Sequence, residues 1–218
     1  MEHIQTFNAQ ALITRLPYGL NDLSGVLELA KGVDDRGLVC LSSPIEIENP
    51  SSISGIITQI EFAGMILISM IAWHRDRHIV TSNSKTLSNT WEPIFVFGKS
   101  KEFHVNRDFI TKVKKGFDTK EGVFDEDEFS TCLGDHWPIR NDRRDRRFLP
   151  AQVVFNLGQF ADLHPNDVVL DPFGNPGIRD ACTSFGWKYL DGGLPSDIRG
   201  LGLILEEEKN EDESLPQD

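Results

Sequence analysis

The most informative segment of the sequence is Val168-Val-Leu-Asp-Pro-Phe-Gly-Asn-Pro-Gly-Ile178. Its apolar start predicts a short buried strand that ends at Asp171, and the Gly/Pro-rich residues after it predict a tight loop. A helix is expected over Ile178–Gly186, and a further strand over Trp187–Leu190. A strand, a Gly-rich loop and a helix in this order are typical of α/β folds, in which ligands bind at the carboxyl ends of parallel strands.

The same alternation extends through the rest of the chain. Continuous apolar runs predict three more strands, and apolar residues at helical spacing predict two more helices. The strands are expected at Gly37–Ser42, Met65–Trp73 and Glu92–Gly98, and the helices at Ser51–Gly64 and Ala151–Leu163. The first apolar segment, Phe7–Ala30, contains Pro17-Tyr18-Gly19, so we expect two short helices around a turn there. The fold class is therefore α/β with a mainly parallel sheet, in one domain over residues 1–205.

Composition excludes several classes of protein. Of the 218 residues, 39% are hydrophobic and 26% charged, which is ordinary for a globular chain and argues against low-complexity repeats. The longest apolar stretch, Phe62–Trp73, is about 12 residues, whereas a bilayer needs roughly 20. The N-terminus lacks the basic and apolar segments of a signal peptide. Three Cys without a CxxC pair favour a reducing, cytoplasmic location and predict no metal site. The short apolar stretch predicts no membrane contact.

Charge is unevenly distributed. The net charge of −12 weighs against unaided binding to nucleic acid, but the tail Glu206–Asp218 holds seven acids and one Lys, and so contributes −6. This tail, residues 206–218, is expected to be disordered. A short Arg run lies between Trp137 and the helix expected at Ala151–Leu163, and its members are Arg140, Arg143, Arg144, Arg146 and Arg147. The run is either a solvated face or a contact to the phosphates of DNA, which would make binding depend steeply on salt.

The stretch around Asp171 resembles the cofactor loop of amino-methylating DNA methyltransferases, VLDPFxGSGT, which binds S-adenosylmethionine. Four further segments are similar to motifs of the same family. They are Leu149–Leu157 (HPAxFPxxL helix), Gly186–Gly193 (GRxxxGIE strand), Asn89–Lys99 (E-x-I-x-x-F-x-K strand) and Ile71–Trp73 (IIW strand). The resemblance covers roughly residues 7 to 195. It implies the Rossmann-like fold of S-adenosylmethionine-dependent methyltransferases and a reaction on adenine N6 or cytosine N4 of DNA.

The order of these motifs matches the β-type permutation of the family, with the catalytic strand first and the cofactor loop last. On this interpretation Leu38–Pro44 is the catalytic strand, which ends in SPPY in the family, and residues 100–147 form the variable recognition segment. Only about 20 residues separate Pro44 from Met65, where the family usually has another helix and strand. The domain is therefore expected to be trimmed.

The resemblance implies a catalytic loop of Ser43, Pro44, Ile45 and Glu46. In the family, the polar side chain and a following carbonyl hold the exocyclic amine of a flipped base, and an aromatic ring stacks on that base. Here Ile45 replaces the second Pro and Glu46 replaces the ring. Stacking contributes roughly 1–3 kcal/mol per base, so this change alone would weaken base binding.

The implied cofactor site also departs from the family. Its residues are Asp171, Pro172, Phe173, Gly174, Asn175, Gly177 and Asp191. Asn175 replaces a glycine of the loop, and Pro176 after it removes one N–H donor. Gly193 aligns with the acid that holds the ribose hydroxyls, so Asp191 is the candidate to substitute for that acid. We therefore expect S-adenosylmethionine binding to be weak or lost.

Three hypotheses follow from these departures. The first is a pseudo-methyltransferase that acts as a DNA-binding or regulatory subunit, beside an active partner protein. The second is a divergent but active DNA amino-methyltransferase, which an intact Pro-Pro-aromatic loop would have favoured. The third is a structural or interaction protein that reuses the fold, which the acidic balance outside the Arg run favours over plain DNA binding.

Overall fold

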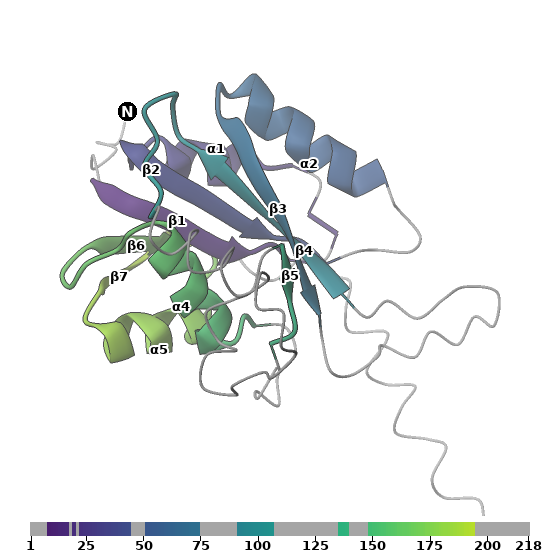
Figure 1. Ribbon diagram of the computed structural model, residues 1–218. Helices are drawn as coiled ribbons and strands as arrows, with labels where there is room; N and C mark the ends of the chain where they lie inside the picture. Colours follow the sequence, from purple (N-terminus) through teal and green to yellow (C-terminus); the bar gives the residue numbers. More distant parts are fainter. Residues whose placement is uncertain are drawn as a thin grey trace, which may run out of the picture.

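The computed structural model describes residues 8–17, 19–20, 22–44, 51–74, 91–106, 135–139 and 148–194. Strands and helices alternate along this part of the chain, as Figure 1 shows. The first half contains β1 (Ala9–Arg15), α1 (Ser24–Ala30), β2 (Val33–Ser42), α2 (Ser51–Phe62), β3 (Ile66–His74) and β4 (Trp91–Gly98). The second half contains β5 (His136–Trp137), α4 (Ala151–Phe160), β6 (Val168–Asp171), α5 (Pro176–Phe185) and β7 (Lys188–Asp191).

One twisted sheet contains all of these strands, in the order β5-β3-β4-β2-β1-β6-β7. The pairs β1·β2, β1·β6, β6·β7 and β3·β5 are parallel. Among these strands, β4 alone runs against its neighbours, β2 and β3. The predicted α/β class and the mainly parallel sheet are therefore confirmed.

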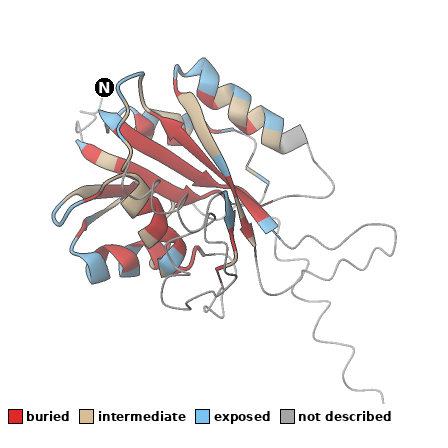
Figure 2. Ribbon diagram, in the orientation of Figure 1, coloured by how far each residue is buried: buried red, intermediate tan, exposed pale blue. Residues whose placement is uncertain are grey.

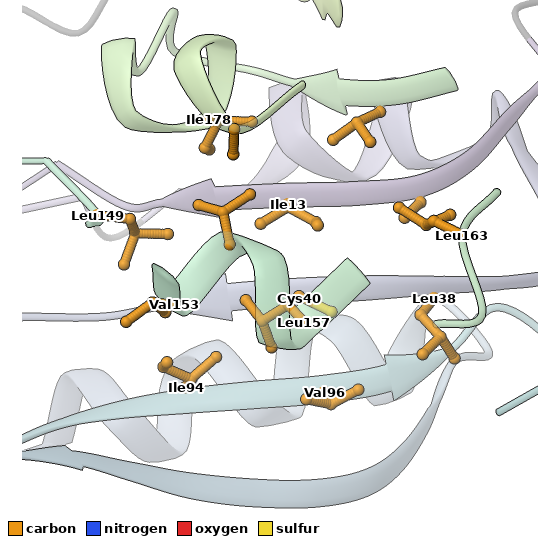
Figure 3. Packing of buried hydrophobic residues seen from close by; sticks show 14 of the residues in the cluster. Ile13, Leu38, Cys40, Ile94, Val96, Leu149, Val153, Leu157, Leu163 and Ile178 are labelled. Carbon is orange, nitrogen blue, oxygen red and sulfur yellow. The ribbon is translucent and has the colours of Figure 1, made fainter. Parts of the chain in front are cut away.

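Helices cover both faces of the sheet, with α1 and α2 on one face and α4 and α5 on the other (Figure 1). Two apolar clusters fill the space between the layers. On the α4 side, Val153 and Leu157 pack against Ile13 and Cys40 of the central strands (Figure 3). Successive residues of a strand point to opposite faces, so the strands β1, β2 and β4 place alternate apolar residues in the two clusters.

The prediction of two helices in the N-terminal segment is wrong for its first part, which forms the strand β1. Helices were expected on both sides of Pro17, but Ala9–Arg15 is a strand between β2 and β6, and only the following Ser24–Ala30 is helical. Almost every residue of β1 is buried, because helices cover both faces of the sheet at its centre. A strand in that position has no polar face, so its apolar residues lack the alternation that reveals half-buried strands.

The other predicted elements are confirmed within one to four residues at their ends. The strand over Gly37–Ser42 begins earlier, at Val33, and the helix over Ala151–Leu163 ends earlier, at Phe160. The expected variable segment lies largely outside the described residues, and the acidic tail entirely so. Both stay predictions.

From the neighbouring strands β1 and β6, the chain continues toward opposite edges of the sheet. From β1 it passes through α1 to β2 on one side, and from β6 it passes through α5 to β7 on the other. The boundary between β1 and β6 is therefore the switch point of the sheet. Ligands of open α/β sheets bind outside the carboxyl ends of the strands at this point.

Candidate functional site at the carboxyl ends of β1 and β6

Asp171, the last residue of β6, forms hydrogen bonds to several of the elements around the switch point. Its buried carboxylate accepts hydrogen bonds from Thr14 Oγ1 of β1 (2.8 Å) and from the Tyr189 hydroxyl of β7 (3.1 Å). It also accepts from the backbone N–H groups of Phe173 and Asn175 in the loop. Burial raises the pKa of Asp171 above its ordinary value, and the donors act in the opposite direction by stabilising the charged form.

Asn175 precedes helix α5 as its N-cap residue, and its side chain accepts a hydrogen bond from a backbone N–H group of the same loop. Its side-chain oxygen accepts a hydrogen bond from the Gly177 N–H (2.9 Å), which caps the helix. The backbone of Asn175 is extended (φ −69°, ψ 118°), as Pro176 after it requires. A Cβ on Gly177 would lie 1.8 Å from the Leu149 carbonyl oxygen, so only glycine fits where α5 meets the start of α4.

Asp191 ends β7 and lies against the same loop. A Cβ on Gly174, which has φ +69°, would be 3.3 Å from the Asp191 carboxylate. The same carboxylate accepts from the Gly193 N–H (2.9 Å) and lies 3.7 Å from the guanidinium of Arg179. The structure therefore brings Asp191 to the predicted cofactor loop, together with all the loop residues named for it. The Arg179 pair is half exposed, so solvent weakens it.

The predicted catalytic residues lie farther from this loop than the sequence implied. Ser43 and Pro44 follow β2, and the Ser43 N–H donates to the Pro93 carbonyl (3.0 Å). The strand β1 lies between β2 and β6, so it is the end of β1 that adjoins Asp171. Ile45 and Glu46 lie outside the described residues. The catalytic role of this tetrad stays a prediction, and the strand order favours a different loop.

Sequence reasoning missed the residues at the end of β1, which read Arg15-Leu16-Pro17-Tyr18-Gly19. They contain the same order of polar residue, Pro and aromatic residue that the family's catalytic loop needs, and they follow the strand whose Thr14 contacts Asp171. Tyr18 itself lies outside the described residues. The Pro-Tyr-Gly triplet in the sequence could have indicated this loop. It was overlooked because the residues on both sides of it were interpreted as helices.

Arg15 forms a buried ion pair with Glu92 at the carboxyl end of β1, a place called the Arg15 corner here. Its Nε and Nη2 donate to the two carboxylate oxygens of Glu92 at 2.7 and 2.9 Å, and the side chains are only 2% and 1% exposed. The Ser42 hydroxyl at the end of β2 donates to the same carboxylate. Two parallel N–H···O bonds to one carboxylate fix both side chains in position. A network of polar side chains therefore links the carboxyl ends of β1 and β2 to the start of β4.

The five Arg residues of the run lie outside the described residues, but both flanks are placed. Before the run, the carbonyl of Ile139 accepts from Trp73 Nε1 near the end of β3 (2.9 Å). After the run, Leu149 is buried and its carbonyl meets the start of α5. The flanking residues Ile139 and Leu149 therefore lie at the carboxyl edge of the sheet, on either side of the switch point.

The described residues contain neither a membrane span nor a metal cluster. No helix in these ranges is long and apolar enough to cross a membrane. Within the same part of the chain, no three His, Cys, Asp or Glu side chains gather as a metal site would require.

Comparison with known proteins identifies the family. The family model described as DNA methylase, for N6 and N4 methyltransferases, matches residues 20–182, which is more than half of the chain. This chain belongs to that family. The match begins directly after Gly19, at the end of the Pro-Tyr-Gly triplet.

One curated relative of this family member is the type II methyltransferase M.MwoI of Methanothermobacter wolfeii, 24% identical over 120 residues. That similarity covers 54% of this chain, and the chain spans only 14% of the length of the relative.

Solved structures of DNA methyltransferases share the fold of this chain. The M1.HpyAVI complex with S-adenosylmethionine superposes with a TM-score of 0.60 at 19% identity, covering 88% of this chain and 86% of that one. The cytosine-N4-specific PvuII DNA methyltransferase gives 0.60 at 14% identity, with 85% and 76% covered. The protein TTHA0409 of Thermus thermophilus, also complexed with S-adenosylmethionine, gives 0.54 at 15% identity, with 92% and 86% covered.

Proposed function

We propose that this member of the DNA methylase family keeps the fold without the methyl-transfer chemistry, and acts as a DNA-binding or regulatory subunit. The observation that carries the proposal is the Arg15–Glu92 pair at the end of β1. This strand adjoins the Asp171 loop, and its Pro17-Tyr18 follows the order of the family's catalytic loop. Arg15 stands where that loop has an acid or a Ser.

Arg15 is unsuited to hold the amine that accepts a methyl group. The amine becomes positive during transfer, so catalysis needs acceptors and negative potential around it. A guanidinium offers donors only, and Glu92 already occupies two of its N–H groups. Leu16 in place of the first Pro also leaves the loop less rigid.

If the catalytic loop of the family corresponds to the end of β1 and not to the end of β2, the helix and strand that seemed to be missing before Met65 are accounted for. Between Gly19 and β3 the chain supplies α1, β2 and α2, which include the helix and strand that counting from Pro44 did not provide. The alternative catalytic loop at Ser43 would require the reacting base to reach past β1 to the cofactor loop.

The residues around Asp171 fit S-adenosylmethionine only in part. Asp191 could hold ribose hydroxyls, and Gly174 permits a close approach. However, the chain's own oxygens accept from the N–H groups of Phe173, Asn175 and Gly177, which would otherwise face an anionic ligand group. We therefore propose that cofactor binding is weak or lost, and we assign no reaction step to it.

The Arg run supports DNA as the partner. The residues on either side of the run, Ile139 and Leu149, lie at the carboxyl edge, where DNA methyltransferases must admit their base. Five Arg in the sequence between them offer strong phosphate contacts. A partner methyltransferase that supplies the missing chemistry would account for a retained fold. The second candidate is an interaction protein without DNA binding, which the net charge of −12 favours.

Two titrations test this proposal. In calorimetry with S-adenosylmethionine, a dissociation constant near 1 μM, about 8 kcal/mol of binding, would restore the active-enzyme hypothesis. In fluorescence anisotropy with duplex DNA, we expect binding that weakens steeply with salt and is lost when Arg143, Arg144, Arg146 and Arg147 are replaced by Gln. If the replacements leave the DNA affinity unchanged, another surface of the protein contacts DNA. If no DNA binding is detected at all, the interaction protein without DNA binding is favoured.

A further inference from the structure

The strand β3 is paired on one side only over most of its length. It pairs with β4 from Ile66 to His74, but on its other side β5 faces only Ala72 and Trp73. Among the described residues, no strand pairs with the outer side of Ile66–Ile71, which is called the β3 edge here. The backbone N–H and C=O groups of such an edge are a template for a further strand.

The hydrogen bonds of β3 show which of its backbone groups point away from β4. The Ala72 N–H donates to the carbonyl of Asp135, on the side of β5. Facing residues of an antiparallel pair alternate between those that bond each other and those that point away from each other. Met70 is two residues before Ala72, and it faces Phe95, which is two residues beyond the residue of β4 that faces Ala72. The N–H and C=O of Met70 therefore point outward as well.

A bulge gives Leu67 the same orientation. The register with β4 shifts between Leu67 and Ser69, so Leu67 faces Phe97 although it is three residues before Met70. Along β4, Phe97 is again two residues beyond the residue that faces Met70, so the backbone groups of Leu67 also point outward. Leu67 and Met70 are thus the two positions at which the β3 edge offers a donor and an acceptor.

The β3 edge is apolar and uncharged. Its residues Ile66–Ile71 read Ile-Leu-Ile-Ser-Met-Ile, without charge or Pro, in a chain of which 26% is charged. Natural proteins protect exposed edges with features such as Lys, Pro or a bulge, and of these three β3 has the bulge alone. The strand is also less buried than the centre of the sheet, as its tan colour beside the red strands of Figure 2 shows.

Two exposed apolar side chains flank this edge on one face. Ile71 belongs to the cluster on the α4 side, so Met70 points to the face that α2 covers, where it is 53% exposed. Phe62 ends α2 on the same face, shortly before β3 begins, and is 88% exposed. Exposed apolar side chains that lie together are typical of protein–protein contacts.

We propose that the β3 edge pairs in antiparallel direction with the β3 edge of a second copy of this chain. The register that fits places Leu67 of each copy opposite Met70 of the other, so that each facing pair exchanges both of its N–H···O bonds. Leu67 packs against the cluster on the α2 side, so the facing side chains lie on one face, as strand pairing requires. A two-fold axis relates the copies, and the contact is isologous.

A second copy suits this edge because the edge complements itself. No like charges face each other across the axis, since Ile66–Ile71 has none. The same axis keeps the two α2 helices on one face and brings Phe62 of one copy toward the Met70 half of the other strand. A charged peptide would instead bury its charges against apolar side chains without a counter-charge.

The contact is expected to be reversible. A strand pair of this length spans about 20 Å, which is small beside the interfaces of obligate dimers. Each copy also carries a net charge of −12, and Glu61 lies next to Phe62, so the copies repel each other at low salt. Added salt should therefore strengthen the dimer. This inference goes beyond the proposed function and depends on neither DNA nor cofactor binding.

The test is sedimentation equilibrium of the full chain over a wide range of concentrations. Met70→Pro removes the outward N–H but leaves the bonds to β4, because Pro is tolerated on an edge strand whose N–H faces away from the sheet. Met70→Leu is the matched control, since it keeps the N–H and an apolar side chain. Phe62→Ser removes the flanking contact. Phe185→Ser is its control, because Phe185 is 36% exposed but packs on Phe155 and Trp187 on the α4 side.

We expect the native chain to dimerise reversibly. Met70→Pro should raise the dissociation constant of the dimer at least about tenfold, or about 1.4 kcal/mol, because the two-fold axis removes the same donor once in each copy. Phe62→Ser should also weaken the dimer, whereas Met70→Leu and Phe185→Ser should leave it unchanged. Circular dichroism establishes that each variant is folded.

Amide hydrogen exchange of the native chain gives a second readout, which does not depend on the folding of any variant. We expect exchange within Ile66–Ile71 to slow as the protein concentration rises. A native chain that sediments as a monomer at every concentration would overturn the inference. If these amides are already protected in that monomer, another segment of the chain covers the edge. A dimer that neither Met70→Pro nor Phe62→Ser weakens would also overturn it, because the copies would then meet at a different surface.

Discussion

Breaking the Arg15–Glu92 pair on one side should be far more costly than replacing both residues. The change to make is Glu92→Gln, which keeps the shape of the side chain and removes its charge. Arg15 would then retain a buried guanidinium, 2% exposed, without the carboxylate that now accepts from its Nε and Nη2. The matching single change is Arg15→Met, which leaves the Glu92 carboxylate buried.

The expected magnitudes follow from burial. Removing one partner of a buried ion pair costs about 3–5 kcal/mol, whereas replacing both by apolar residues is often neutral. The double change Arg15→Met with Glu92→Met removes the acceptor of the Ser42 hydroxyl as well, which costs about 1 kcal/mol. We therefore expect each single variant to lose at least about 3 kcal/mol, and the double variant only about 1 kcal/mol.

Urea unfolding followed by circular dichroism measures these differences. The control is Glu28→Gln, because Glu28 pairs with Lys31 in the open, and exposed pairs contribute about 0–1 kcal/mol. If Glu92→Gln is no more destabilising than Glu28→Gln, or if the double variant loses the sum of the two single losses, the pair does not hold the corner closed.

Three further predictions concern the rest of the fold. Deleting Glu206–Asp218 should leave the melting temperature within about 2 °C in calorimetry, because this segment has almost no apolar surface to bury, and a larger drop would mean that it docks. Gly177→Ala should lower the free energy of unfolding in urea by about 3 kcal/mol or more, because the added Cβ would lie 1.8 Å from the Leu149 carbonyl oxygen. The control Gly193→Ala has open space but φ +68°, so it should lose only about 1 kcal/mol, and equal losses in the two variants would refute the steric reasoning. Ser43→Ala should stay folded by circular dichroism, because the backbone bond from its N–H to Pro93 survives the change, and unfolding would show that its hydroxyl supports the corner.

The sequence predicted the fold where local signals agree and failed where tertiary burial decides. The segment from β6 through α5 was predicted to within two residues at its ends, because an apolar run followed by Gly and Pro residues marks the end of the strand. Asn175 was not recognised as a helix cap, so α5 begins at Pro176, two residues before the predicted start. The strand β1 was missed because burial on both faces removes its period-two pattern. A short apolar segment interrupted by Pro17 then looked like helices.

The candidate site divides in the same way. The residues of the cofactor loop are contiguous, so a motif could find them. The polar corner at the end of β1 is formed by Arg15 and Glu92, which are 77 residues apart in sequence and meet only because β4 runs antiparallel beside β2. Which strand end adjoins Asp171 depends on strand order, and the choice between Pro17 and Pro44 could not be made without it.

We expect that this member of the DNA methylase family does not transfer methyl groups. The most direct measurement is incorporation of tritiated methyl from S-adenosylmethionine into mixed-sequence duplex DNA, with and without a candidate partner subunit, for the native chain, Ser43→Ala and Asp171→Ala. We expect background counts from the isolated chain, and any counts with a partner to be unaffected by Ser43→Ala. Turnover by the isolated chain that disappears in Asp171→Ala would contradict the account, and its loss in Ser43→Ala would place the catalytic loop after β2.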